Sequence, residues 1–157
     1  MDVKIRDACM DDLQALVTLL QDLFSIEADF SADAERQRRG LMLMLDGCGK
    51  HRCIKVAEAD GIVVGMCTAQ TLISTAEGAT VALVEDMVVD SDYRGRGIGR
   101  RLMAAIETWS RRRGAVRLQL LADRTNFSAL DFYDRIGWIP TQLICLRRKC
   151  IDPPNPA

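Results

Sequence analysis

Apolar residues along this chain follow two spacings, the 3.6-residue repeat of amphipathic helices and the alternation of strands. In the first third, the pattern predicts a strand at Val3 to Ala8 and a helix that Asp11 or Asp12 caps. A second helix is predicted from about Ser31 to Asp46, where two nearby glycines end it. The apolar face of the first helix comprises Leu13, Leu16, Val17, Leu20 and Phe24.

The rest of the chain alternates predicted strands with predicted helices. Two of the strands meet at Asp60-Gly61, a dipeptide typical of tight hairpins. The order β-α-α-β-β-β-α-β-α-β predicts an α/β (α+β) domain over residues 1–150, followed by a flexible, proline-containing tail at 151–157. The elements of this part are strands at Cys53 to Glu58, Ile62 to Ile73, Val81 to Val89, Ala115 to Leu121 and Gln142 to Arg148, and helices at about Gly97 to Arg112 and Asn126 to Ile136.

Length and composition indicate a protein with one hydrophobic core and argue against a nucleic-acid-binding or membrane protein. A chain of 157 residues with 48% hydrophobic residues supplies one well-filled core, and 27% charged residues suit a soluble surface. The formal net charge of −1 provides no general attraction for nucleic acid or an anionic membrane. No apolar run approaches the roughly 18–20 residues of a membrane span, and the N-terminus lacks a signal-peptide layout. We therefore expect a cytoplasmic protein with no nucleic-acid and no membrane partner.

The cysteines do not predict a metal site. There are six of them, without a CxxC pair, and the chain has a single histidine. Cys48, His51 and Cys53 lie close together in the sequence, but they are too few for a closed zinc site. We expect reduced thiols that pack as small apolar residues, and no metal.

The most informative segment is Arg94-Gly95-Arg96-Gly97-Ile98-Gly99, which stands between a predicted strand and a predicted helix. Alternating glycines let successive backbone N–H groups converge, and the first helical turn adds unpaired N–H groups and a positive dipole end. This arrangement, with two arginines beside it, predicts a phosphate-binding turn. The segment lacks the Lys-Ser or Lys-Thr pair of a P-loop, and the first glycine of a dinucleotide fingerprint would fall at Arg94.

Two segments resemble the GCN5-related N-acetyltransferase (GNAT) family. The first is the Arg-x-x-Gly-x-Gly spacing from Arg94 to Gly99, after a strand that carries two acids. The resemblance covers about residues 80–140 and implies a mixed sheet that splays apart after its central strand, with acetyl-CoA as co-substrate. The second segment comprises Asn126, Ala129, Phe132-Tyr133 and Gly137-Trp138.

The same resemblance implies which residues bind coenzyme A. Backbone groups from Arg94 to Arg100 would hold its pyrophosphate, with help from the Arg94 side chain. Main-chain groups of the strand before the turn would contact its pantetheine arm. Asn126 either reaches the cofactor or caps its own helix. The implied cofactor-binding residues are Met87, Val88, Val89, Arg94, Gly95, Arg96, Gly97, Ile98, Gly99, Arg100 and Asn126.

Acetyl transfer from a thioester to an amine needs a neutral amine and a proton for the departing thiolate. Tyr133 is the predicted acid, because a phenol that titrates near pH ~10 can protonate a thiolate. Glu85 is the predicted base, acting through water or with a pKa raised by burial. Glu85 and Asp86 face opposite sides of a regular strand, so only one points into the cleft, and a β-bulge would change which one. We expect structural hydrogen bonds at Asp86.

The predicted function is transfer of an acetyl group to a primary amine by direct attack in a ternary complex. The acceptor is a small molecule or a peptide, and acids in the loops around it favour a cationic amine such as a polyamine, an aminoglycoside or a lysine-like group. A non-catalytic acyl-CoA-binding regulatory module of the same fold is the alternative. A homodimer through the edge at Gln142 to Leu146 is a further expectation by analogy. The basic run from Arg111 to Arg113 is interpreted as a solvated helix end.

Overall fold

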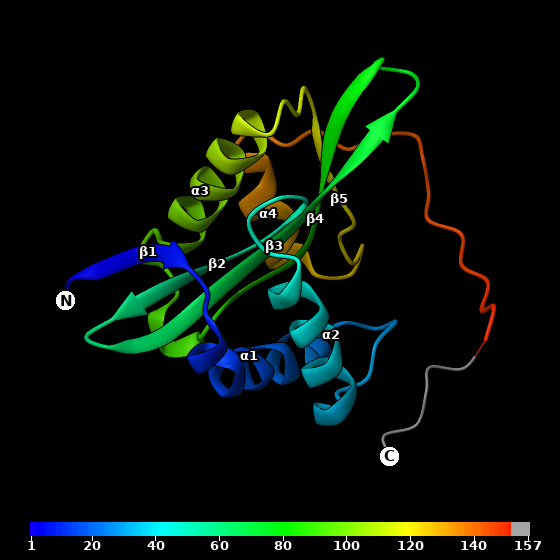
Figure 1. Ribbon diagram of the computed structural model, residues 1–157. Helices are drawn as coiled ribbons and strands as arrows, with labels where there is room; N and C mark the ends of the chain where they lie inside the picture. Colours follow the sequence, from blue (N-terminus) through cyan, green and yellow to red (C-terminus); the bar gives the residue numbers. More distant parts are fainter. Residues whose placement is uncertain (152–157) are drawn as a thin grey trace. The chain divides into compact units, whose positions relative to one another are not determined.

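The structure, a computed structural model, describes residues 1–151 (Figure 1). They divide into two compact units, residues 1–120 and the described residues from 121 onward. The tail predicted at 151–157 lies, beyond Ile151, outside the described residues. One domain over residues 1–150 stays a prediction. The first unit contains β1 (Val3–Asp7), α1 (Leu13–Ile26), α2 (Ala34–Asp46), β2 (Arg52–Ala59), β3 (Ile62–Ser74), β4 (Ala79–Val89), α3 (Ile98–Arg112) and β5 (Leu118–Leu120), and the second contains α4 (Phe127–Arg135).

Five strands of the first unit form one sheet in the order β1-β2-β3-β4-β5. The first four strands are antiparallel neighbours, and β5 runs parallel to β4. Asp60 and Gly61 join β2 to β3 with φ angles of 49° and 82°. These are the left-handed conformations that a two-residue type I′ turn requires. The predicted α+β class and the predicted hairpin are therefore confirmed.

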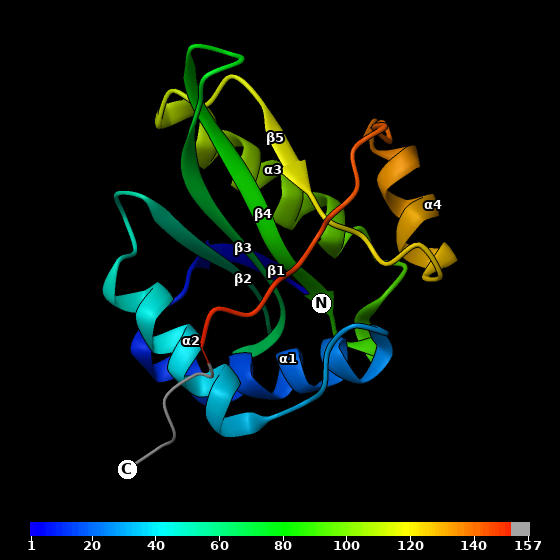
Figure 2. The ribbon, with the colours of Figure 1, turned by 90° about the vertical axis from the view of Figure 1, so that its right-hand side faces the viewer.

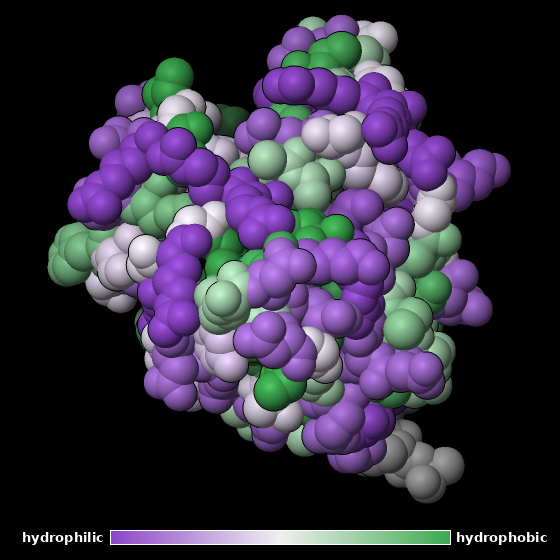
Figure 3. Space-filling view, turned by 90° about the vertical axis from the view of Figure 1, so that its left-hand side faces the viewer, coloured by the Kyte–Doolittle hydropathy of each residue, from purple (hydrophilic) through white to green (hydrophobic). Residues whose placement is uncertain are grey.

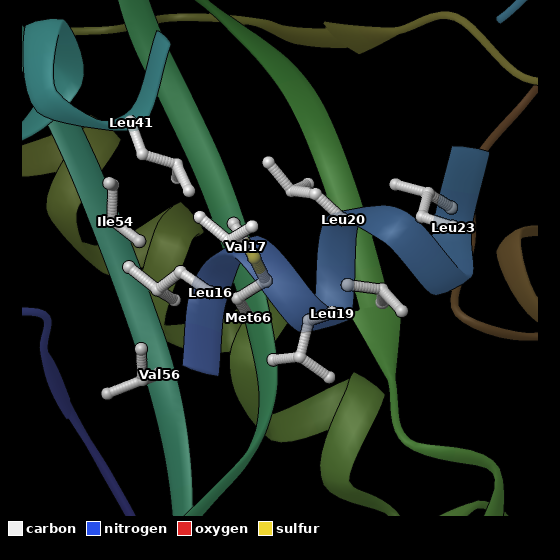
Figure 4. Close-up of a cluster of buried hydrophobic side chains, with 10 residues drawn as sticks. Leu16, Val17, Leu19, Leu20, Leu23, Leu41, Ile54, Val56 and Met66 are labelled. Atoms are coloured by element: carbon white, nitrogen blue, oxygen red, sulfur yellow. The ribbon is translucent and has the colours of Figure 1, made fainter. Parts of the chain in front are cut away.

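Helices cover both faces of this sheet. On one face, α1 and α2 pack against β2, β3 and β4 through buried aliphatic side chains (Figures 2 and 4). On the other face lies α3, where a Cβ on Gly65 would come within 3.2 Å of the Leu102 side chain. This close approach explains a glycine in the middle of β3. The cluster on the α1 and α2 face is formed by Leu16, Val17, Leu19, Leu20, Leu23, Leu41, Ile54, Val56, Met66 and Val88.

The last two strands pair over a short distance only. Leu118–Leu120 of β5 pairs with Ala82, Leu83 and Val84 of β4, whereas β4 continues to Val89. Within residues 1–120, no strand therefore pairs with the outer edge of β4 beyond Val84. Backbone groups along that edge are available to a ligand, because an unpaired strand edge presents free N–H and C=O groups.

Two predicted elements begin three residues later in the structure, and one predicted helix cap is absent. The second helix begins at Ala34 and not near Ser31, because the Asp33 carboxylate accepts a hydrogen bond from the Arg36 N–H and caps it there. The strand predicted from Ala115 shortens to Leu118–Leu120. Asp12 stands at the N-cap position of α1 but makes no capping hydrogen bond to that helix; its carboxylate binds Arg6 and the Cys9 N–H instead.

The strand predicted at Gln142 to Arg148 is wrong. The structure has no strand in that range, and the side chains of Leu143 and Leu146 are each 86% exposed. β-branched and aliphatic residues favour an extended backbone, but a strand also needs a neighbour that completes its hydrogen bonds. The local sequence determines the preference for an extended backbone, but it does not determine whether a neighbouring strand is present.

Of the helices in residues 1–151, none combines the length and the apolar character needed to cross a membrane.

Candidate active site

The glycine-rich turn lies between the end of β4 and the start of α3. Gly95 and Gly97 have φ angles of 72° and 77°, and a Cβ on either would meet nothing within 4 Å. The left-handed backbone therefore requires glycine for its conformation, and the space beside it is open. Gly97 is the N-cap residue of α3, and no side chain caps this helix.

The uncapped end of α3 leaves backbone donors without partners. The first hydrogen bond of the helix runs from the Arg101 N–H to the Gly97 carbonyl. The N–H groups of Ile98, Gly99 and Arg100 precede it, so they have no acceptor within the helix. Three orphan donors and the positive end of a 15-residue helix form a site suited to a phosphate or diphosphate. The residues present thus fit the pyrophosphate of coenzyme A.

The arginine side chains of the turn make local contacts. Arg94 Nε donates to the Val89 carbonyl at 2.8 Å, which ties the turn back to the end of β4. Arg96 donates to the Asp92 carbonyl at 3.2 Å, and its guanidinium lies 5.6 Å from the centroid of the Tyr93 ring. Both side chains are exposed beside the turn. They add positive charge there and also stiffen the backbone that carries the N–H donors.

A β-bulge on β4 places two carboxylates. Val84 pairs with Ala69 and Met87 pairs with Cys67, so three steps on β4 match two steps on β3. Partners across a ladder share a face of the sheet, which puts Val84 and Met87 together on the α3 face. The two residues between them, Glu85 and Asp86, therefore both lie on the opposite face, which α1 and α2 cover. The expectation that only one of them can point to that side is wrong, because the bulge adds a residue to the alternation.

Asp86 is held by Thr68, the residue opposite the bulge on β3. The Thr68 hydroxyl donates to Asp86 Oδ2 at 3.0 Å, and the Asp86 N–H donates to the same hydroxyl at 3.0 Å. Burial raises the pKa of Asp86 to about 6, the Thr68 hydrogen bond lowers it, and the Glu85 carboxylate raises it again. No cationic side chain in residues 1–151 forms an ion pair with either Glu85 or Asp86. Thr68 is a residue that sequence reasoning missed, since nothing in the sequence around Thr68 predicts that a bulge lies opposite it.

Glu85 differs from its neighbour in exposure. Its side chain is exposed, whereas Asp86 is half-buried. The bulge thus places the accessible carboxylate of Glu85 next to Asp86, whose pKa is raised. Four residues farther along, β4 ends at Val89, whose carbonyl the turn contacts through Arg94. One strand therefore brings together the candidate base, the main-chain groups of Met87, Val88 and Val89, and the glycine turn.

The remaining two candidates lie on α4, in the second unit. Asn126 is the N-cap residue of α4, and its Oδ1 accepts a hydrogen bond from the Ala129 N–H at 3.1 Å. Tyr133 lies two turns farther along, with ring centroids 5.3 Å from Phe132 and 6.1 Å from Trp138. The Trp138 N–H donates to the Tyr133 carbonyl, which holds the end of α4 against these rings. Of the two roles considered for Asn126, the structure contains the helix cap.

Among residues 1–151, no three His, Cys, Asp or Glu side chains gather into a group able to hold a metal ion. The six cysteines are free thiols. Burial raises the pKa of Cys53 to about 12 and raises the pKa of Cys67 as well. These two thiols act as apolar core residues.

Comparison with known proteins adds four findings. The model of the acetyltransferase (GNAT) family matches residues 13–138. An uncharacterised N-acetyltransferase of Methanocaldococcus jannaschii is 32% identical over 90 residues, which are 57% of this chain and 40% of that protein. One of Archaeoglobus fulgidus is 29% identical over 132 residues, covering 83% of this chain and 89% of that protein. A solved aminoglycoside N-acetyltransferase in complex with CoA has a TM-score of 0.79 at 19% identity, covering 96% of each chain.

Proposed function

This chain belongs to the acetyltransferase (GNAT) family, and we propose that it transfers an acetyl group from acetyl-CoA to a primary amine by direct attack in a ternary complex. The family match agrees with the family and the enzyme class, an acyltransferase, that the sequence predicted. The observation that carries the proposal is the end of β4. There β4 carries a bulge with two carboxylates that form no ion pair with a cation of residues 1–151, and an uncapped glycine turn follows the strand.

In this proposal the turn binds and orients the co-substrate. The N–H groups of Ile98, Gly99 and Arg100 hold the diphosphate, and the unpaired edge of β4 from Met87 to Val89 offers main-chain groups to the pantetheine arm. These groups, Met87 to Val89 and the turn from Arg94 to Arg100, form the coenzyme A clamp. Positioning a thioester beside an amine contributes about 7–11 kcal/mol in favourable cases. The clamp therefore supplies the largest part of the rate enhancement.

The carboxylates receive the amine. An alkylammonium titrates near pH ~10, and two carboxylates on one face without cationic partners are complementary to its charge. Glu85, the exposed one, removes the proton through water, and Asp86 beside it keeps the local potential negative. Tyr133 donates a proton to the departing thiolate. Together, acid and base groups of this kind contribute roughly 10²–10⁴-fold.

The acceptor class follows from the charge at the bulge. We propose a cationic amine on a small molecule or a peptide, because the carboxylate pair favours a positive group. The solved neighbour that acts on aminoglycosides is one precedent for such an acceptor. We further propose that the enzyme works in the cytoplasm, where its free thiols stay reduced.

The first experiment measures coenzyme A binding by calorimetry for wild type, Gly97→Val and Gly78→Val. Both glycines have positive φ, 77° and 62°, and open space beside them, so valine strains both turns equally. Only Gly97 lies in the clamp, and we expect at least about a tenfold loss of affinity there and little change for Gly78→Val. No measurable association of coenzyme A with wild type would refute the proposal.

The second experiment separates an enzyme from a non-catalytic module. Thiol release from acetyl-CoA is followed with a polyamine, an aminoglycoside, a lysine derivative and a peptide amine. Turnover on any of them that falls about 10²-fold or more in Tyr133→Phe, with coenzyme A affinity retained, supports the assigned acid. Tight binding of coenzyme A without turnover on any amine would favour the acyl-CoA-binding module.

A further inference from the structure

A cavity lies at the end of α3 opposite to the glycine turn. It has a volume of about 490 Å³ and is lined by the last two turns of α3 and by one residue each from β1 and β2. On α3 the lining begins at Ala104, six residues or ~9 Å along the helix axis from Ile98, and it includes no residue of the glycine turn. The cavity is therefore separate from the proposed coenzyme A clamp. Its lining comprises Asp7, Lys55, Ala104, Ala105, Thr108, Trp109, Arg112 and Arg113.

The charges on the walls are unbalanced. Lys55 pairs with Asp7, which accounts for the single carboxylate of the lining. Arg112 and Arg113 form no ion pair with any acid in residues 1–151. The walls thus carry an excess of two positive charges, which outweighs the roughly half negative charge of the helix C-terminus. An anion, and not a cation, is the complement of this cavity.

The position of Arg113 is fixed before any ligand arrives. Its guanidinium lies 5.8 Å from the centroid of the Trp109 ring and donates to the Gly49 carbonyl. Stacking and the hydrogen bond hold the guanidinium of Arg113 in place, so a ligand that binds it does not have to immobilise this side chain. Guanidinium groups recognise carboxylates and phosphates through paired N–H donors.

The rest of the lining leaves room beside these cations. Ala104, Ala105 and Thr108 are small and occupy the face of α3 that looks into the cavity. The indole of Trp109 adds an apolar wall and is itself only 8% exposed. The face of the molecule on the side of the N-terminus is mostly hydrophilic, with small apolar areas between the polar side chains (Figure 3). A volume of this size is within the range of small-molecule sites, about 300–1,000 Å³.

We propose that this cavity is a second ligand site, which binds a small anion bearing a carboxylate or a phosphate next to a flat or apolar group. The anionic group contacts Arg112 and Arg113, and the apolar part lies against Trp109 and the small side chains of α3. The site does not depend on the proposed acetyl transfer, and it binds its ligand whether or not the amine substrate is present.

The test is an NMR titration of the full-length ¹⁵N-labelled protein with inorganic phosphate and, separately, with benzoate. The chain has two tryptophans, so the indole N–H of Trp109 is one of two signals and is easily assigned. We expect this signal to shift in a saturable way, with benzoate binding more tightly than phosphate because its ring contacts the apolar wall. The variant Arg112→Gln should weaken binding about tenfold, whereas Arg111→Gln removes the same charge from a neighbour outside the lining and should leave binding nearly unchanged.

Three results would overturn the proposal. One is the absence of a saturable shift at Trp109 with either anion. Another is an equal loss in Arg111→Gln and Arg112→Gln, which would indicate general attraction to a basic surface. The third is a shift confined to the backbone N–H groups of Ile98, Gly99 and Arg100, which would place the anion at the glycine turn. Failure of coenzyme A binding at the glycine turn would leave the first two readouts interpretable, since they concern Trp109, Arg111 and Arg112 in the second half of α3.

Discussion

The pKa values of two aspartates of the first unit are shifted in opposite directions, and their surroundings explain the difference. Asp12, where β1 meets α1, accepts hydrogen bonds from both terminal nitrogens of Arg6, at 2.8 and 2.9 Å, and from the Cys9 N–H. These bonds, led by that from Arg6, lower the pKa of Asp12 to about 2. Asp86, at the bulge of β4, has a hydroxyl partner and forms no ion pair within residues 1–151, and burial raises its pKa to about 6.

The comparison separates a structural carboxylate from one suited to chemistry. At the corner where β1 meets α1, the guanidinium of Arg6 neutralises the Asp12 carboxylate, whose side chain is only 7% exposed. Asp12 therefore connects the start of α1 to the sheet. At the bulge neither carboxylate pairs with a cation of the described chain, and the exposed one, Glu85, can meet a substrate. Groups with raised proton affinity and no structural counter-charge mark functional sites more often than neutralised ones do.

The largest effect is expected from removing the accessible charge at the bulge. Glu85→Gln should lower kcat by about 10²–10⁴-fold, because a glutamine cannot accept the proton of the amine. Steady-state rates of thiol release measure this. The matched control is Glu58→Gln at the corner, which removes a carboxylate that binds Arg6 and should leave kcat within about twofold. Equal losses in both variants would contradict the division between the two regions.

The next effect concerns stability at the corner. Asp12→Asn should lower the free energy of unfolding by about 3 kcal/mol near neutral pH, because Arg6 loses its paired acceptor. Urea unfolding followed by circular dichroism measures it. Asp12 has a lowered pKa, so its contribution is present above its ordinary value and disappears as the pH falls towards about 2. The difference between wild type and Asp12→Asn should therefore shrink as the solution is acidified, and a difference independent of pH would contradict the ion pair as its cause.

A smaller effect of opposite sign is expected at the bulge. The pKa of Asp86 is raised to about 6, so folding is favoured while the group is protonated and is penalised as the pH rises through that value. Asp86→Asn should therefore raise the free energy of unfolding by about 2 kcal/mol near pH ~8 and by much less near pH ~4. The same urea experiment at both pH values tests this. A loss of stability at the higher pH would contradict burial as the origin of the raised pKa.

The smallest effect concerns the partner of Asp86. Thr68→Val removes the hydroxyl that donates to the carboxylate, so the pKa of Asp86 should rise further, by about one pH unit or less. The acid limb of the profile of kcat/KM against pH should move to higher pH by a similar amount. Thr68→Ser keeps the donor and should restore the wild-type profile. A profile that stays in place in Thr68→Val would show that Asp86 does not influence the reaction.

Much of the fold followed from residue patterns. The hairpin at Asp60-Gly61 was predicted because a type I′ turn needs two left-handed residues that this dipeptide supplies. The helix after the glycine turn was predicted to within one residue, since its apolar face and Gly97 mark its start. The strand at Gln142 to Arg148 was not predicted correctly, because pairing depends on a neighbour that lies elsewhere in the sequence.

The sequence by itself determined the family, the glycine turn and the identity of the candidate acid and base. Local conformational requirements and residue spacing are properties of short segments, and they persist whatever the rest of the chain does. Tertiary structure alone decided that Glu85 and Asp86 share a face, because that depends on the register between β3 and β4. It also decided that Thr68 holds Asp86 and that no cation of residues 1–151 pairs with either carboxylate, because pKa values are set by neighbours in space and not by neighbours in sequence.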